Sequence, residues 1–211
     1  MIQYKSNMAA EEVIGEHSSV DNFENLPNPE RVLLFSGKRK SGKDYITDIL
    51  HERIGVERSV IIKISAPIKT HWAKALNLDV EELMSDKPYK EKYRLQLCKW
   101  GEDVRKKDSG YFCSAAVNMY AAHSKPIWIV SDIRRKTDIK WFTDNYKDAC
   151  KTIRVVCSDS LRQKRGWSFT EGIDDAETEC DLDDVQNWDL EVENNDENIE
   201  PILQQILHLI N

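Results

Sequence analysis

The chain has 211 residues, of which 40% are hydrophobic and 32% are charged. This length supports one core of ordinary size, and no apolar run approaches the roughly 20 residues that cross a bilayer, so a membrane protein is excluded. The start of the chain resembles neither a secretory signal nor a basic transit peptide, and the last residues are no targeting tripeptide. The five cysteines form no C-x-x-C pair. We therefore expect reduced thiols in a cytosolic protein.

The net charge of -7 hides a strong segregation along the chain. Residues 1–30 carry a charge of -5, and residues 166–211 contain fourteen acidic residues with no lysine or arginine. The remaining segment, residues 31–165, therefore carries +12. Such a basic segment is expected to face anions.

Hydrophobic periodicity divides the chain into an extension and a folded region. Residues 1–30 show no helical or strand period, so we predict a flexible acidic extension followed by a single domain over residues 31–211. Short β-branched runs predict strands at 32–35, 60–64, 127–130, 153–157 and, more weakly, 190–192. Amphipathic stretches predict helices at 42–53, 67–76, 90–107, 111–123, 139–146 and 199–209. This alternation favours an α/β fold with a mainly parallel five-stranded sheet flanked by helices.

A glycine-rich basic turn joins the first predicted strand to the first predicted helix. It consists of Gly37, Lys38, Arg39, Lys40, Ser41, Gly42 and Lys43, followed by Asp44. Glycines between a strand and a helix let backbone N–H groups surround a phosphate, and the helix N-terminus adds partial positive charge. We predict a nucleotide-phosphate loop in which Lys43 reaches the β- and γ-phosphates. The alternative is an ordinary basic turn.

Two features of this loop depart from the usual pattern. Asp44 stands where Ser or Thr commonly helps to bind magnesium, and a carboxylate is a suitable oxygen ligand for Mg²⁺, directly or through water. Lys38, Arg39 and Lys40 provide more positive charge than one nucleotide requires. A second anionic reactant is therefore predicted.

A second polar cluster follows the predicted strand at 127–130. Asp132 lies at the carboxyl end of that strand, where P-loop proteins place a second magnesium-associated acid. Arg134 and Arg135 come next and can clamp a phosphate or carboxylate through two hydrogen bonds. The alternative is that Asp132 only caps the following helix.

Two further basic regions are candidates for binding the acceptor and closing the site. Residues 67–123 form the predicted acceptor region, where Lys90 and Arg94 share a helix face through their four-residue spacing. Residues 159–180 form the predicted lid, in which Arg165 stabilises charge in the transition state. The acidic residues Asp174, Asp175 and Glu177 are expected to cap a helix or pair with the basic lid. The alternatives are solvated surface cations and an ordinary surface loop.

Over residues 31–195 the sequence resembles the animal-type phosphomevalonate kinases, which belong to the nucleoside-monophosphate-kinase-like P-loop group. The resemblance rests on the loop from Leu34 to Asp44, on Tyr89-Lys90-Glu91, on Trp100-Gly101-Glu102, on Pro126 to Arg135, and on Arg165-Gly166-Trp167 with Asp174 to Glu177. It implies transfer of the γ-phosphoryl group of ATP to 5-phosphomevalonate, with Mg²⁺, in the mevalonate route to isoprenoids.

The same resemblance implies roles for individual residues. Lys38, Lys40 and Lys43 serve the ATP phosphates, and Arg165 belongs to the nucleotide lid. Lys69, Lys90, Arg94, Arg105, Arg134, Arg135 and Asn194 correspond to positions for substrate binding or catalysis. Asn195 is placed beside ATP although relatives can carry histidine there. The tail from Asn198 to Gln204 lacks an arginine found in some members.

Three other classes of protein share some of these features. A nucleotide kinase of the same fold is the nearest alternative. A regulatory GTPase is disfavoured because no N-K-x-D base-reading motif occurs. A nucleic-acid binder would explain the basic middle, but the acidic tail and the lack of interleaved aromatic residues oppose it. We expect a monomer that binds neither nucleic acid nor a membrane.

Overall fold

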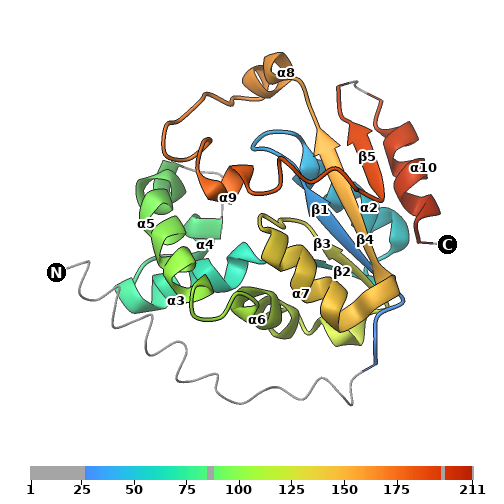
Figure 1. The fold of residues 1–211 in the computed structure, drawn as a ribbon, viewed down its shortest axis with the longest axis horizontal. Coiled ribbons are helices and arrows are strands. Elements are labelled where there is room, and N and C mark those ends of the chain that lie inside the picture. Colours follow the sequence, from blue (N-terminus) through green and yellow to red (C-terminus); the bar gives the residue numbers. More distant parts are fainter. Residues whose placement is uncertain (1–26, 85–87, 196–197, 211) are drawn as a thin grey trace. The chain divides into compact units, whose positions relative to one another are not determined.

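The computed structural model describes residues 27–84, 88–195 and 198–210 (Figure 1). This part of the chain divides into two compact units, one containing residues 64–119 and the other containing residues 28–63 and 120–210. Most of the predicted N-terminal extension lies outside the described residues. Each unit has its own packed interior, and the larger one contains the sheet and the glycine-rich loop.

The larger unit is built on a five-stranded sheet in the order β2-β3-β1-β4-β5, and every neighbouring pair is parallel. The strands are β1 (Arg31–Ser36), β2 (Ser59–Ile62), β3 (Ile127–Val130), β4 (Cys150–Val156) and β5 (Leu190–Glu193). The predicted α/β class with a parallel sheet is confirmed. Because β1 is central, the loop that follows it opens between the carboxyl ends of neighbouring strands, where α/β proteins bind ligands.

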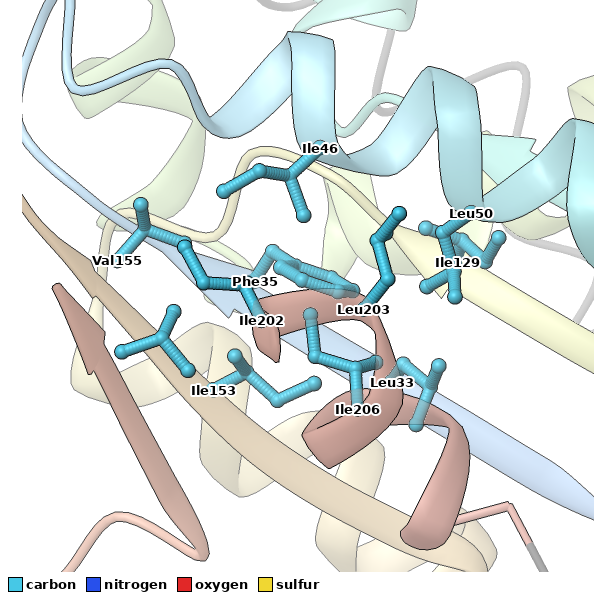
Figure 2. Packing of buried hydrophobic residues seen from close by; sticks show 11 residues of the cluster. Leu33, Phe35, Ile46, Leu50, Ile129, Ile153, Val155, Ile202, Leu203 and Ile206 are labelled. Carbon is cyan, nitrogen blue, oxygen red and sulfur yellow. The ribbon is translucent and has the colours of Figure 1, made fainter. Parts of the chain in front are cut away.

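One face of the sheet is covered by α2 (Lys43–Ile54) and α10 (Glu200–His208). Figure 2 shows Ile46 and Leu50 of α2 and Ile206 of α10 meeting side chains of β1, β3 and β4, among them Phe35 and Ile153. All five of these side chains are fully buried. This packing fixes the start of α2, and therefore the end of the loop, against the sheet.

The opposite face is covered by α7 (Lys136–Tyr146). Successive side chains of a strand point to opposite faces of the sheet. Trp128 of β3 therefore points away from the face covered by α2, where its neighbour Ile129 is packed. Trp128 packs edge-on against Tyr146 with ring centroids 4.8 Å apart. Burial raises the pKa of the Tyr146 hydroxyl above its ordinary value.

The smaller unit is helical and contains α3 (Ser65–Leu76), α4 (Val80–Met84), α5 (Pro88–Arg105) and α6 (Tyr111–Met119). An aromatic cluster holds three of these helices together. Trp100 of α5 lies 6.0 Å from Trp72 of α3 and 5.9 Å from Phe112 of α6, measured between ring centroids. All three rings are buried.

Several predicted boundaries move, and local geometry explains two of the shifts. The helix predicted over 111–123 ends at Met119, and Ala121 adopts a left-handed conformation with φ of 46° before a short 3-10 turn, η2 (Ala122–Ser124). The helix predicted from residue 139 begins at Lys136, because the Asp138 carboxylate accepts the backbone N–H groups of Arg134 and Arg135 at 2.9 and 3.1 Å. The region predicted as a lid, residues 159–180, starts with a helix, α8 (Asp159–Lys164), and also contains α9 (Glu177–Cys180).

The packing of α10 gives a stability prediction. Leu203 is fully buried against the sheet, so Leu203→Ala should lower the free energy of unfolding by about 2–5 kcal/mol through lost burial and a residual cavity. Urea unfolding measures this change. The matched control is Gln205→Ala on the exposed side of the same helix, which should stay within about 0.5 kcal/mol. Equal effects of the two substitutions would contradict the described packing.

Candidate active site

The glycine-rich loop turns sharply between β1 and α2. Lys40 and Gly42 both have positive φ, of 61° and 87°, and the Ser41 N–H donates to the Lys38 carbonyl at 3.1 Å. A Cβ on Gly42 would lie 2.2 Å from Nδ2 of Asn194, and one on Gly37 would lie 2.8 Å from the Val155 carbonyl oxygen. Glycine is therefore needed at both positions because neighbouring atoms leave no room for a Cβ. At Gly42 it is also needed because the backbone is left-handed.

Lys43 links the loop to the end of β3. Its side chain is 8% exposed, and Nζ donates to the Ser131 carbonyl and to Oδ1 of Asp44, the latter at 2.8 Å. A buried ammonium needs such partners because desolvation is costly. The two predicted segments, the loop and the end of β3, thus lie side by side.

The structure offers oxygen ligands that fit Mg²⁺. Burial acts to raise the pKa of Asp44, but the charge and the hydrogen bond of Lys43, together with the charges of Lys63 and Arg134, outweigh this effect. The pKa is therefore lowered, and the carboxylate is ionised at neutral pH. The Oγ atoms of Ser41 and Ser131 are buried without a hydrogen-bond partner among the described residues.

Within the described ranges, no three His, Cys, Asp or Glu side chains gather into a metal site. Mg²⁺ is usually held by one or two carboxylates together with substrate phosphates and water. Asp132 lies near Tyr120, whose pKa is raised by burial and by the charge of Asp132.

Two side chains from distant segments converge on the Ser41 carbonyl oxygen. Nη1 of Arg165 donates to it at 3.0 Å, and Nδ2 of Asn194 donates to it at 2.8 Å. Arg165 also donates from Nη2 to the Asn194 carbonyl at 3.2 Å. The predicted lid arginine and the predicted substrate residue thus meet at the loop. Asn195 accepts the Ser158 N–H at 2.9 Å.

The loop cations contact acidic residues of the segment 174–184, which we name the acidic segment. Lys38 Nζ donates to Oδ2 of Asp183 at 2.5 Å and to the Glu179 carbonyl at 2.7 Å. Arg39 pairs with Asp174 at 2.8 Å, and Asp174 also accepts the Trp167 indole N–H at 2.9 Å. Asp174 was expected to cap a helix or to pair with the basic lid, but its cation partner is Arg39 of the loop, and from the lid it accepts the Trp167 indole N–H.

Arg134 and Arg135 pair with the same acidic segment. Arg134 donates from Nη1 to Oε1 of Glu179, and Nη1 of Arg135 lies 3.3 Å from Oε1 of Glu177. The cap of α7 is formed by Asp138, so the capping role considered for Asp132 belongs to that residue. Asp175 accepts the Gly172 N–H at 2.6 Å within the lid.

Two arginines near the loop were not among the predicted site residues. Arg154 of β4 donates to Ser36 Oγ at 2.7 Å and pairs with Asp183 at 2.9 Å. Arg162 of α8 donates to the Arg39 carbonyl at 2.8 Å, and its guanidinium lies 3.9 Å from the Trp167 ring centroid. A charged residue within the apolar run 153–157 was the signal for Arg154. No sequence signal separated Arg162 from its basic neighbours.

The remaining predicted substrate residues belong to the helical unit. Lys69 lies in α3, Arg94 lies in α5, and Arg105 ends α5 with its guanidinium 5.4 Å from the Phe112 ring centroid. Lys90 lies in α5, but its side chain is outside the described part of the structure. Their role in binding an acceptor stays a prediction.

The geometry of Gly42 gives a testable expectation. Gly42→Ala should abolish binding of a fluorescent ATP analogue, because the new Cβ clashes with Asn194 and the residue cannot easily keep its positive φ. Gly55→Ala is the matched control, since Gly55 also has positive φ, of 97°, but its Cβ would meet nothing within 4 Å. The control should lose stability and keep binding. Normal binding by the Gly42 variant would contradict the role of the loop.

None of the described helices combines the length and the apolar composition needed to span a membrane.

Comparison with known proteins identifies the family of this chain. Residues 35–148 match the sequence profile of a family described as phosphomevalonate kinase. The phosphomevalonate kinase of Drosophila melanogaster is 46% identical over 170 residues, which cover 79% of this chain and 89% of that protein. The chain therefore belongs to the phosphomevalonate kinase family.

Proposed function

We propose that this protein transfers the γ-phosphoryl group of ATP to 5-phosphomevalonate, giving 5-diphosphomevalonate and ADP in the mevalonate route to isoprenoids. The observation that carries the proposal is the concentration of cations around the glycine-rich loop, with Lys43 buried at its end, in a chain of this family. Transfer between two polyanions requires their charges to be neutralised and their atoms aligned.

ATP is assigned to the loop. Its backbone N–H groups and Lys38, Arg39, Lys40 and Lys43 would surround the phosphates. Lys43 is the strongest candidate to contact the β- and γ-phosphates, because its ammonium is held at the end of β3 by the Ser131 carbonyl. Arg165 would stabilise the charge that develops on the transferred group, since it is already held at Ser41 in the loop. Asn195 would lie beside the nucleotide.

The acceptor is assigned to the remaining cations and to Asn194. These residues are Lys69, Lys90, Arg94, Arg105, Arg134 and Arg135. A phosphate monoester has a second pKa of about 6, so the attacking oxygen is already deprotonated at neutral pH and no general base is required. The protein then acts by binding, orienting and neutralising the two reactants. Lys38 and Arg134 take part in binding a reactant and also in neutralising charge during the transfer.

Magnesium is assigned to Asp44 and Asp132, with the Ser41 and Ser131 hydroxyls as further oxygen atoms near the loop. When bound, the ion would neutralise phosphate charge and orient the β- and γ-phosphates. The ionised state of Asp44 and its position beside Lys43 support this assignment.

We also propose that the enzyme works as a cytosolic monomer. The odd number of cysteines, without a C-x-x-C pair, favours a reducing compartment. Light scattering of the purified protein tests the monomer.

A substrate panel tests the function. The protein is mixed with ATP, Mg²⁺ and either 5-phosphomevalonate or nucleoside monophosphates, and ADP release is followed with a coupled assay. We expect turnover with 5-phosphomevalonate only, and none when Mg²⁺ is chelated. Lys43→Met should lower turnover about 100- to 1,000-fold. This variant shows how much ADP release is independent of the loop lysine. The control is Lys140→Met on the exposed face of α7, which should behave as wild type. Turnover with nucleotides alone would contradict the proposal.

Arg165→Ala tests the assignment of this arginine to the transition state. Its kcat should fall about 100-fold, whereas the KM for ATP should change less than about tenfold, because charge stabilisation matters most during transfer. Steady-state kinetics separate the two effects. The neighbouring exposed Lys164→Ala is the control and should leave both constants unchanged. An unchanged kcat in Arg165→Ala would show that this residue does not stabilise the transferred phosphoryl group.

A further inference from the structure

The acidic segment contacts nearly the same cations that the proposed function assigns to phosphates. Its carboxylates pair with Lys38, Arg39, Arg134 and Arg135, and also with Arg154. These cations come from the loop, from the end of β3 and from β4, whereas all their partners lie between Asp174 and Asp183. One short stretch of chain therefore presents carboxylates to most of the phosphate-binding surface of the larger unit.

The Asp183 carboxylate bridges two cations, as a bound phosphate can. Its Oδ2 accepts from Lys38 Nζ at 2.5 Å, and its Oδ1 accepts from Arg154 Nη2 at 2.9 Å. One anionic group thus bridges a loop cation and a strand cation through two oxygens. A phosphate group bridges cations in the same way, with charge-assisted hydrogen bonds from different side chains.

Lys38 cannot serve Asp183 and a phosphate fully at the same time. An ammonium has three donors, and here they face Asp183, the Glu179 carbonyl at 2.7 Å and Cys180 Sγ at 3.6 Å. A phosphate that binds Lys38 must displace one of these partners. Asp183 is the partner with a negative charge, so phosphate and Asp183 repel one another as well as compete.

Exposure makes the Asp183 pair the one suited to exchange. The side chains of Lys38 and Asp183 are 28% and 42% exposed, so water can solvate both groups when they separate. The Glu179 side chain that pairs with Arg134 is only 5% exposed. Separating that pair would leave a buried carboxylate without its cation, which is strongly unfavourable.

We propose that Asp183 competes, as an internal anion, with the phosphates of the nucleotide for Lys38. This inference rests on the proposed function, because it takes Lys38 as a ligand of ATP. A phosphate that binds Lys38 must displace Asp183, so the pair weakens nucleotide binding by the free energy of that displacement.

Calorimetric binding of a non-hydrolysable ATP analogue, AMP-PNP with Mg²⁺, tests this competition. Asp183→Asn should lower its Kd about two- to fivefold, the range expected when one partly exposed ion pair no longer competes. Asp183→Glu keeps the negative charge and should behave as wild type. In kinetics, the KM for ATP should fall in Asp183→Asn without a rise in kcat.

The adjacent residue provides a matched control. Asp184→Asn removes the same charge from a 71% exposed side chain, but its partner is Lys136 at 2.7 Å, which has no assigned role in phosphate binding. We expect no change in binding or in either kinetic constant. An effect of equal size in both variants would show a general charge effect and overturn the proposal.

Two other outcomes would overturn the competition. An unchanged Kd in Asp183→Asn would mean that Asp183 does not oppose phosphate. Weaker binding of AMP-PNP by this variant would mean that Asp183 orients Lys38 and Arg154 for binding.

The wild-type protein separates this inference from the proposed function. If it binds AMP-PNP but does not phosphorylate 5-phosphomevalonate, only the proposed function is contradicted, since the calorimetric comparison needs no acceptor. Wild-type protein that does not bind AMP-PNP overturns both.

Discussion

The Ser41 carbonyl oxygen is the point on which the site depends. It accepts from Asn194 at 2.8 Å and from Arg165 at 3.0 Å, so both of its lone pairs are used. The donors Asn194 and Arg165, which follow β5 and α8, lie 153 and 124 residues along the chain from Ser41. Together they fix the peptide between Ser41 and Gly42, where the backbone has the left-handed φ of 87° that glycine tolerates best. The loop is therefore shaped by distant segments as well as by its own glycines.

The separation of charge along the sequence becomes a set of local contacts in the fold. The basic middle and the acidic C-terminal segment meet at the carboxyl ends of β1, β3 and β4. Gathering this many cations at one edge of a sheet would be unfavourable without nearby anions, because like charges repel in a partly buried setting. The acidic segment therefore makes a concentrated phosphate-binding surface compatible with a stable fold.

The sequence predicted the features that depend on local patterns. Apolar runs located the five strands, and the glycines with Lys43 located the loop and its place between strand and helix. The contacts of Asn194 with Ser41 and of Asp183 with Lys38 join residues 153 and 145 positions apart, so no local pattern could predict them. A predicted boundary was wrong where a single side chain determines where a helix begins, as Asp138 does at the N-terminus of α7. Asn194 was identified through the resemblance alone, and the structure places its side chain against the Ser41 carbonyl oxygen of the loop.

Burial divides the site cations into two groups with different tasks. Lys43 and Arg135 are nearly buried, with side chains 8% and 5% exposed, so their positions are set by the fold before any substrate arrives. Such preorganised charges need little rearrangement during transfer and can therefore stabilise a transition state strongly. Lys38 is 28% exposed and pairs with a partly exposed carboxylate, so it can follow a phosphate as it binds. A kinase that must hold two polyanions in line needs both groups, because fixed charges define the geometry and adaptable ones allow entry and release.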